Sequence, residues 1–210
     1  MYQQDLQDPA STTMIGIYKF NSHLFGVILT IVLLIGWILY STLSNFVELS
    51  QSHVFNFTHS NKIEIVWTMT PAFVLLSLAS PSFALLYSLD EISSSILTLK
   101  ILGHQWYWSY EISDFNSCSD ENQNLKYSSY ILNDEFLKEN NYLGLFRNLE
   151  TNKRVFLPKI LHLRLLLTAL DVLHSWAIPS FGVKIDACPG RLNQGTLFIK
   201  RNGVFFGMWF

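Results

Sequence analysis

Two kinds of side chain in this sequence could do chemistry: sulfur and imidazole groups that bind metals, and aromatic groups that stand beside acidic ones. The two cysteines, Cys118 and Cys188, lie seventy positions apart. This spacing fits no Cys-x-x-Cys metal or redox motif, so free thiols are the default interpretation and a disulfide is the minority one. Six histidines are scattered along the chain, and a lone histidine is more often a core residue than a metal ligand.

The aromatic side chains concentrate in HQWYWSYEI, residues 104–112. Alternation with a period of two predicts a strand with Trp106, Trp108 and Tyr110 on one face and Glu111 on the other. An acidic patch beside exposed aromatic rings could steer a basic partner protein, whereas a merely solvated face is the alternative interpretation.

Charge is unevenly distributed over the same part of the chain. Residues 90–150 hold ten acidic and four basic side chains, a balance of −6, and residues 151–210 hold two acidic and eight basic ones, a balance of +6. The net charge of the whole chain is −2, which by itself says nothing about partners.

The elements that position these residues begin with two apolar stretches. Half of the residues are hydrophobic and only 14% are charged, a composition that indicates a membrane protein with a soluble part. No charged residue lies between Lys19 and Glu48, or between Glu64 and Asp90. Because twenty helical residues rise about 30 Å, each stretch predicts a transmembrane helix. Two buried helices of a soluble protein are the alternative.

Short strands follow the second apolar stretch. Residues 96–101 and 104–112 alternate with a period of two and are separated by Gly103, and residues 160–168 alternate as well. Asn202-Gly203 predicts a hairpin turn between the apolar segments on either side of it, residues 196–201 and 204–210. Several short strands of this kind predict a β-sandwich or a small barrel.

Two long motifs indicate which family this is. They are GHQWYWSYEISDF at residues 103–115 and DVLHSWAIPSFGVKIDACPGRLNQ at residues 171–194. In this order, behind two apolar spans, they strongly resemble subunit II of cytochrome c oxidase. The shorter segments QDPAS, EIVWTMTP and PSFALLYSLDE extend the resemblance over nearly the whole chain.

The resemblance implies a transmembrane two-helix hairpin followed by a cupredoxin-like β-sandwich domain. The expected divisions are an N-terminal segment at 1–21, the hairpin at 22–90 and a partial cupredoxin-like domain at 91–210. The resemblance also implies a function in a proton-translocating respiratory oxidase. Electrons from cytochrome c would enter at a dicopper centre and pass to the haems of subunit I. Expected partners are cytochrome c and oxidase subunits I and III, with no nucleic acid. The expected location is the mitochondrial inner membrane with the soluble domain in the intermembrane space, or a bacterial plasma membrane with a periplasmic domain.

Three residues receive direct roles in electron and proton transfer from the resemblance. His174 matches the copper-ligand histidine of the family, and Trp106 matches the tryptophan through which electrons enter. Glu64 matches the carboxylate at the entrance of the proton-uptake pathway of subunit I. The other five histidines receive no metal assignment.

Five further residues match positions at the surfaces of the family's complex. Glu111, Asp114 and Asp171 match acidic positions that dock cytochrome c, although a solvated surface charge remains the alternative for each. Asp186 matches a residue near the magnesium site shared with subunit I. Arg191 matches a residue in the haem-propionate region, where a guanidinium suits propionates because it stays charged and binds in a fork.

The family pattern departs from this sequence after Gly207. The family continues there with Cys-x-Glu-x-Cys-x-x-x-His-x-x-Met, which supplies every dicopper ligand except one histidine, whereas this sequence reads Met208-Trp209-Phe210. Two bridging thiolates are needed to hold the copper pair, and neither Cys118 nor Cys188 can replace them.

The leading hypothesis is therefore a split subunit II. Its β-sandwich would be incomplete at the C-terminus, and a separate polypeptide would supply the missing ligands and the last strand. The isolated chain is not expected to be active. A copper-free structural subunit, as in quinol oxidases, and a truncated non-functional product are the alternatives.

Overall fold

The computed structural model describes residues 6–48, 59–91, 94–112, 125–133 and 146–209. The chain divides into two compact units, and each is described by itself. One unit comprises residues 19–86 and the other comprises residues 1–18 together with 87–210. The first unit is helical, and the second contains all the strands of the described residues.

Two long helices account for the apolar stretches in the described part of the chain. Helix α1 spans Thr12–Glu48 and helix α2 spans Asn61–Asp90, and both are long and apolar enough to cross a membrane. Threonine hydroxyls donate to carbonyls one turn back, as Thr68 Oγ1 does to the Glu64 carbonyl at 2.7 Å. These bonds satisfy polar groups that would otherwise be costly in a bilayer.

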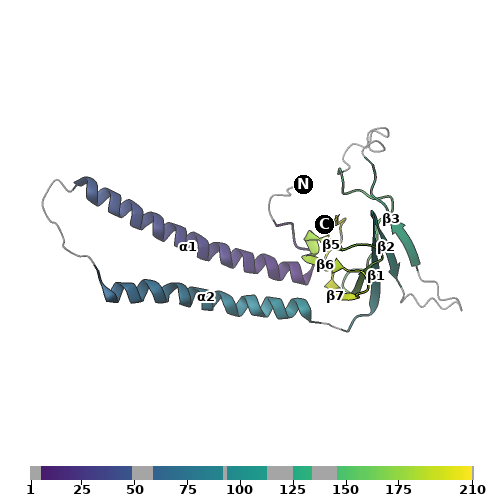
Figure 1. The fold of residues 1–210 in the computed structure, drawn as a ribbon, viewed down its shortest axis with the longest axis horizontal. Helices are drawn as coiled ribbons and strands as arrows, with labels where there is room; N and C mark the ends of the chain where they lie inside the picture. Colours follow the sequence, from purple (N-terminus) through teal and green to yellow (C-terminus); the bar gives the residue numbers. More distant parts are fainter. Residues whose placement is uncertain (1–5, 49–58, 92–93, 113–124, 134–145, 210) are drawn as a thin grey trace. The chain divides into compact units, whose positions relative to one another are not determined.

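The remaining elements form two sheets in the described residues (Figure 1). The five-stranded sheet has the order β3-β2-β1-β4-β7, and the three-stranded sheet has the order β6-β5-β8. The bounds of the first sheet are β1 Leu97–His104, β2 Tyr107–Ile112, β3 Leu125–Ser129, β4 His162–Ala169 and β7 Asn193–Phe198. The bounds of the second sheet and its short helix are β5 His174–Ile178, η1 Pro179–Phe181, β6 Val183–Ala187 and β8 Met208–Trp209.

The core of this domain lies between the two sheets. β1 and β4 pair in parallel with Leu99 opposite Leu165, and the alternate leucines of β4 are fully buried. Trp176 and Ile178 of β5 belong to the same apolar cluster as these leucines. The predicted β-sandwich is thus confirmed, because the inward-facing positions of β1 and β4 follow the period-two pattern of the sequence.

The start of the chain is part of this β domain. The Ala10 amide donates to the Ser180 carbonyl at 2.9 Å, and the Lys200 amide donates to the Ala10 carbonyl at 2.8 Å. Ser11 is fully buried, and its hydroxyl donates to the Phe181 carbonyl at 2.6 Å. The same hydroxyl accepts the Met14 amide at 3.0 Å, so Ser11 also caps helix α1.

Two predicted turns are corrected. The turn between β1 and β2 lies at residues 105–106 and not at Gly103, because Gly103 pairs with Trp108 inside the ladder. The predicted hairpin at Asn202-Gly203 does not form. β7 pairs with β4, β8 pairs with β5, and the amide of Lys200 bonds to the N-terminal segment instead. The chain therefore crosses from one sheet to the other between residues 199 and 207.

Candidate functional site around His174

His174 is the first residue of β5 and is only 6% exposed. Its register partner on β6 is Ala187. The edge of the Trp108 ring approaches the imidazole with ring centroids 5.8 Å apart. On β1, a Cβ atom added at Gly103 would come within 2.8 Å of His174 Cδ2. The imidazole is therefore closely packed between the two sheets, and a glycine at 103 is required by the close approach.

Asp171 binds the imidazole from the bend that precedes β5. His174 Nε2 lies 2.7 Å from Asp171 Oδ1, which also accepts the Val172 amide at 2.7 Å. Asp171 Oδ2 accepts the Gln105 amide at 2.5 Å. The hydrogen bond from His174, supported by the two amides, holds the pKa of the Asp171 carboxyl at about 2 against its usual 3.8. An ionised carboxylate can only accept, so Nε2 donates to Asp171, and a carboxylate partner of this kind fixes the orientation of the ring.

Trp106 lies in the two-residue turn that joins β1 to β2. Its side chain is 72% exposed, and the peptide bond from Gln105 to Trp106 is cis. The following residue, Tyr107, stacks on His104 with centroids 4.3 Å apart and on Tyr130 at 4.5 Å. The alternation had predicted Trp106 on one strand face with Trp108. The structure corrects this: the predicted electron-entry tryptophan lies on the surface, in the turn between the two strands.

The remaining predicted docking residues are only partly described. Glu111 on β2 forms an ion pair with Lys100 on β1, with Nζ and Oε2 3.6 Å apart. Asp114 lies outside the described residues. Of the two docking acids that the structure describes, Asp171 is the one in contact with His174.

Asp186, Arg191 and Glu64 lie on different elements. Asp186 is on β6 opposite Ser175, one position from the pair that contains His174. Arg191 follows in a turn closed by its amide and the Cys188 carbonyl at 3.3 Å. Glu64 is in the first turn of α2, in the helical unit. Asp186 is therefore next to the His174–Ala187 pair in the β5–β6 ladder, but its exposed side chain lies on the opposite face of the sheet, and Glu64 belongs to the separate helical unit.

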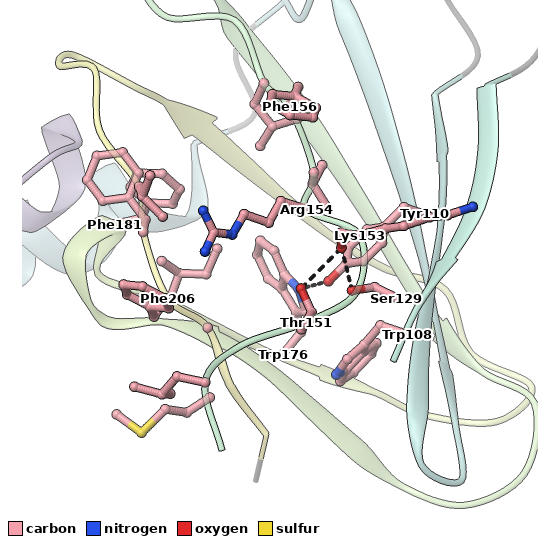
Figure 2. A pocket seen from close by; sticks show the side chains of 18 of the residues that line it. Trp108, Tyr110, Ser129, Thr151, Lys153, Arg154, Phe156, Trp176, Phe181 and Phe206 are labelled. Carbon is pink, nitrogen blue, oxygen red and sulfur yellow. Dashed lines mark hydrogen bonds between the residues drawn. The ribbon is translucent and has the colours of Figure 1, made fainter. Parts of the chain in front are cut away.

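A cavity of about 490 Å³ opens between the sheets on the same side of β5 as His174. Trp176, two residues along the strand from His174 and so on the same face, lines it together with Trp108. Figure 2 shows further aromatic rings around the cavity, including Phe181 and Phe206. Its polar wall contains the Lys153 carbonyl, which accepts the hydroxyls of Ser129 at 2.8 Å and Thr151 at 3.1 Å.

Sequence reasoning missed both this cavity and the contacts of Asp171. The cavity brings residues within 148–159 and 199–208 together with residues of β2 and β5, and no local pattern of the sequence shows that these segments meet. The Asp171-x-x-His174 spacing was the one available signal for the carboxylate–imidazole pair, because a bend of this length can bring two such side chains together.

The donor set around His174 fits one imidazole ligand of a metal centre. Among the described residues, no group of three or more His, Cys, Asp or Glu side chains is placed to hold a metal ion. The thiolates that would bridge two coppers are therefore not supplied by the described part of this chain.

The fold and this site define a membrane-anchored β-sandwich protein with a buried histidine and an exposed tryptophan, whose turn is bonded to the same aspartate as the histidine. The sequence matches the family "Cytochrome C oxidase subunit II, periplasmic domain" over residues 97–209 and "Cytochrome C oxidase subunit II, transmembrane domain" over residues 1–85. The chain belongs to the cytochrome c oxidase subunit II family. It is accordingly a transmembrane subunit of a respiratory oxidoreductase whose family normally binds a dicopper centre.

Curated relatives agree with this assignment. Cytochrome c oxidase subunit 2 of Phytophthora megasperma is 48% identical over 98% of this chain and 75% of the relative. The protein of the same name from Cyanidium caldarium is 46% identical over 98% of this chain and 78% of the relative. In a solved structure, the periplasmic domain of subunit II of cytochrome oxidase from Bradyrhizobium japonicum is 31% identical. The superposition covers 55% of this chain and 72% of the Bradyrhizobium japonicum chain, with a TM-score of 0.43.

Proposed function

We propose that this chain docks cytochrome c and contributes His174 as one ligand of a dicopper centre that passes electrons to subunit I. The observation that carries the proposal is a buried imidazole with Nε2 bonded to a carboxylate, two residues along β5 from Trp176, which lines an aromatic cavity. Imidazole nitrogen is a suitable copper ligand, and a bound copper pair would supply one-electron transfer. Trp106 receives the electron at the surface, and Glu111, Asp114 and Asp171 attract the basic face of cytochrome c.

In this proposal the remaining copper ligands come from a separate polypeptide. The cavity would give such a polypeptide an apolar surface to pack against. One of the residues that line the cavity, Phe156, is 87% exposed. Four of the lining residues are basic: Lys153, Arg154, Lys159 and Arg201. An uncovered apolar surface of this kind favours a protein partner. Charge complementarity leads us to expect an apolar segment with acidic side chains.

The other matched residues belong to contacts with the rest of the oxidase. Asp186 contributes to a magnesium site shared with subunit I, and Arg191 contacts the haem-propionate region. Glu64 lies at the entrance of the proton-uptake pathway, and subunit III completes the core. We place the complex in the mitochondrial inner membrane with the β domain in the intermembrane space, as befits a chain whose Glycine max relative is named as mitochondrial.

The test of the ligand assignment is His174→Asn in the purified oxidase, with His162→Asn as the matched control. His162 is on β4 and contacts the Phe198 ring at a tilt, with centroids 4.7 Å apart, and it has no metal role in the proposal. Loss of the near-infrared copper absorption is expected in the His174 variant alone, with the protein still in the membrane. A normal band in that variant would remove His174 from the ligand set and favour a copper-free structural subunit.

The test of the separate polypeptide is intact-mass spectrometry of the denatured complex together with copper analysis. We expect a chain of the mass of residues 1–210 and a second, stoichiometric polypeptide that contains two cysteines. A continuous polypeptide that carries both parts would refute the split while leaving the role of His174 intact. An oxidase without copper in this domain would refute both.

A further inference from the structure

Asp171 connects two parts of the candidate site that the sequence keeps far apart. One carboxylate oxygen bonds to His174 Nε2 at 2.7 Å, and the other accepts the Gln105 amide at 2.5 Å. The Gln105 amide belongs to the turn that carries Trp106. The exposed tryptophan turn and the buried imidazole are thus both bonded to one side chain.

We propose that Asp171 is a positioning residue that holds the His174 imidazole and the Trp106 turn in fixed relation through one carboxylate. This inference rests on the proposed function in that it takes His174 as a copper ligand. It assigns to Asp171 a task that differs from docking cytochrome c, because docking needs only the charge whereas positioning needs both oxygens in place.

The contacts around the ring support a positioning role. A histidine ring bonded through one nitrogen to a carboxylate has its tautomer and orientation fixed. Gly103 restricts the same ring from β1, since a Cβ there would lie 2.8 Å from His174 Cδ2, and Trp108 meets the ring edge-on. Asp171 therefore holds the ring by a hydrogen bond, while Gly103 and Trp108 restrict it by packing; these three residues form the socket of His174.

The bend itself is also held by Asp171. Oδ1 accepts the Val172 amide at 2.7 Å, and the Leu170 amide donates to the Gly103 carbonyl at 3.2 Å. With the bond from the Gln105 amide to Asp171, the bend between β4 and β5 is bonded once to β1 and once to the turn that follows β1. A glutamate at 171 would be one methylene longer and would keep the charge. It could not accept all three hydrogen bonds, from His174, Val172 and Gln105, in the same positions.

The experiment compares Asp171→Glu, Asp171→Asn and Glu111→Gln in the assembled oxidase, with haem absorbance as the measure of assembly. Each variant is measured for its dicopper near-infrared and paramagnetic resonance spectra, for copper retained against a chelator, and for the KM of cytochrome c. If Asp171 positions the ring, both Asp171 variants change the spectra and retain copper about 10-fold less firmly, as is usual when such a partner is lost. Glu111→Gln removes an acid without touching His174 and should leave the spectra unchanged.

The outcomes separate this inference from the proposed function. Wild-type spectra and copper retention in both Asp171 variants, with KM raised in Asp171→Asn as in Glu111→Gln, would overturn the positioning role and leave docking. A normal copper band in His174→Asn would overturn the ligand assignment itself. Altered spectra in Asp171→Glu, with its charge retained, support positioning, because docking alone predicts no change.

Discussion

Gly103→Ala tests whether the tight packing around His174 matters. The added methyl group would lie 2.8 Å from His174 Cδ2 and 3.1 Å from Trp108 Cζ3, whereas ordinary contacts begin at 3.4 Å. The imidazole must then move by about 0.6 Å, the difference between 3.4 and 2.8 Å. The hydrogen bond from His174 Nε2 to Asp171 Oδ1 is 2.7 Å long. If the imidazole moved directly away from Asp171 by that amount, the bond would stretch to about 3.3 Å, beyond the usual range.

This overpacking is expected to lower the free energy of unfolding of the β domain. Extra methyl groups in a packed interior usually destabilise by about 1–3 kcal/mol. For a domain of this size, each kcal/mol lowers the melting temperature by roughly 4 °C. Gly103→Ala is therefore expected to melt about 4–12 °C lower than the wild type and to shift the dicopper absorption band.

Gly195→Ala is the matched control for this prediction. An added Cβ there would collide with Ile185 Cδ1, the end of a flexible side chain on β6. Because that side-chain end can move aside, Gly195→Ala should lower the melting temperature less than Gly103→Ala does and leave the copper spectrum unchanged, as thermal unfolding and absorption of the assembled oxidase would show. If Gly103→Ala keeps both the wild-type melting temperature and the wild-type spectrum, the reasoning about the socket is wrong.

Four other predictions concern separate parts of the β domain. Trp106→Ala should lower turnover with cytochrome c while the melting temperature stays nearly constant, because the ring is largely exposed; Glu111→Gln should instead raise KM and flatten its salt dependence in the same steady-state assay. Burial raises the pKa of Tyr110 and Tyr127 to about 12 from 10.0. The folded state therefore keeps protons that the unfolded state loses, so the free energy of unfolding should fall as pH rises from 10 to 12, measured by denaturation alongside tyrosinate absorbance. Ser11→Ala should cost about 1 kcal/mol in thermal unfolding, because a buried helix cap is lost; an unchanged melting temperature would contradict that role.

Local patterns predicted those parts of the fold whose environment is uniform along the segment. The two apolar stretches form α1 and α2, and the alternate leucines at 163, 165 and 167 are fully buried on β4. Along each of these segments a given face meets the same surroundings from end to end. The spacing of its apolar residues therefore indicates its secondary structure directly. Strand β3, by contrast, lies in a polar stretch where no pattern predicted it.

The failures occurred where distant segments compete for the same backbone groups. Asn202-Gly203 has a strong hairpin signal, but the Lys200 amide is bonded to the carbonyl of Ala10, nearly two hundred residues away. The Gln105 amide is likewise bonded to Asp171. Neither partner can be recognised from a local window, so the turn chemistry of the sequence was outweighed by tertiary hydrogen bonds.

The candidate site followed the same division between local and distant information. The family motifs pointed to His174 and Trp106, but they did not show how a buried histidine and an exposed aromatic ring are connected. A protein that accepts electrons from a partner needs the first group shielded from water and the second accessible to that partner. Placing Trp106 on a two-residue turn and His174 at the start of an inner strand meets both requirements. The two locations then belong to different sheets, and a bend that reaches from one sheet to the other must hold them together. Asp171 is the side chain in that bend whose two oxygens bond to both.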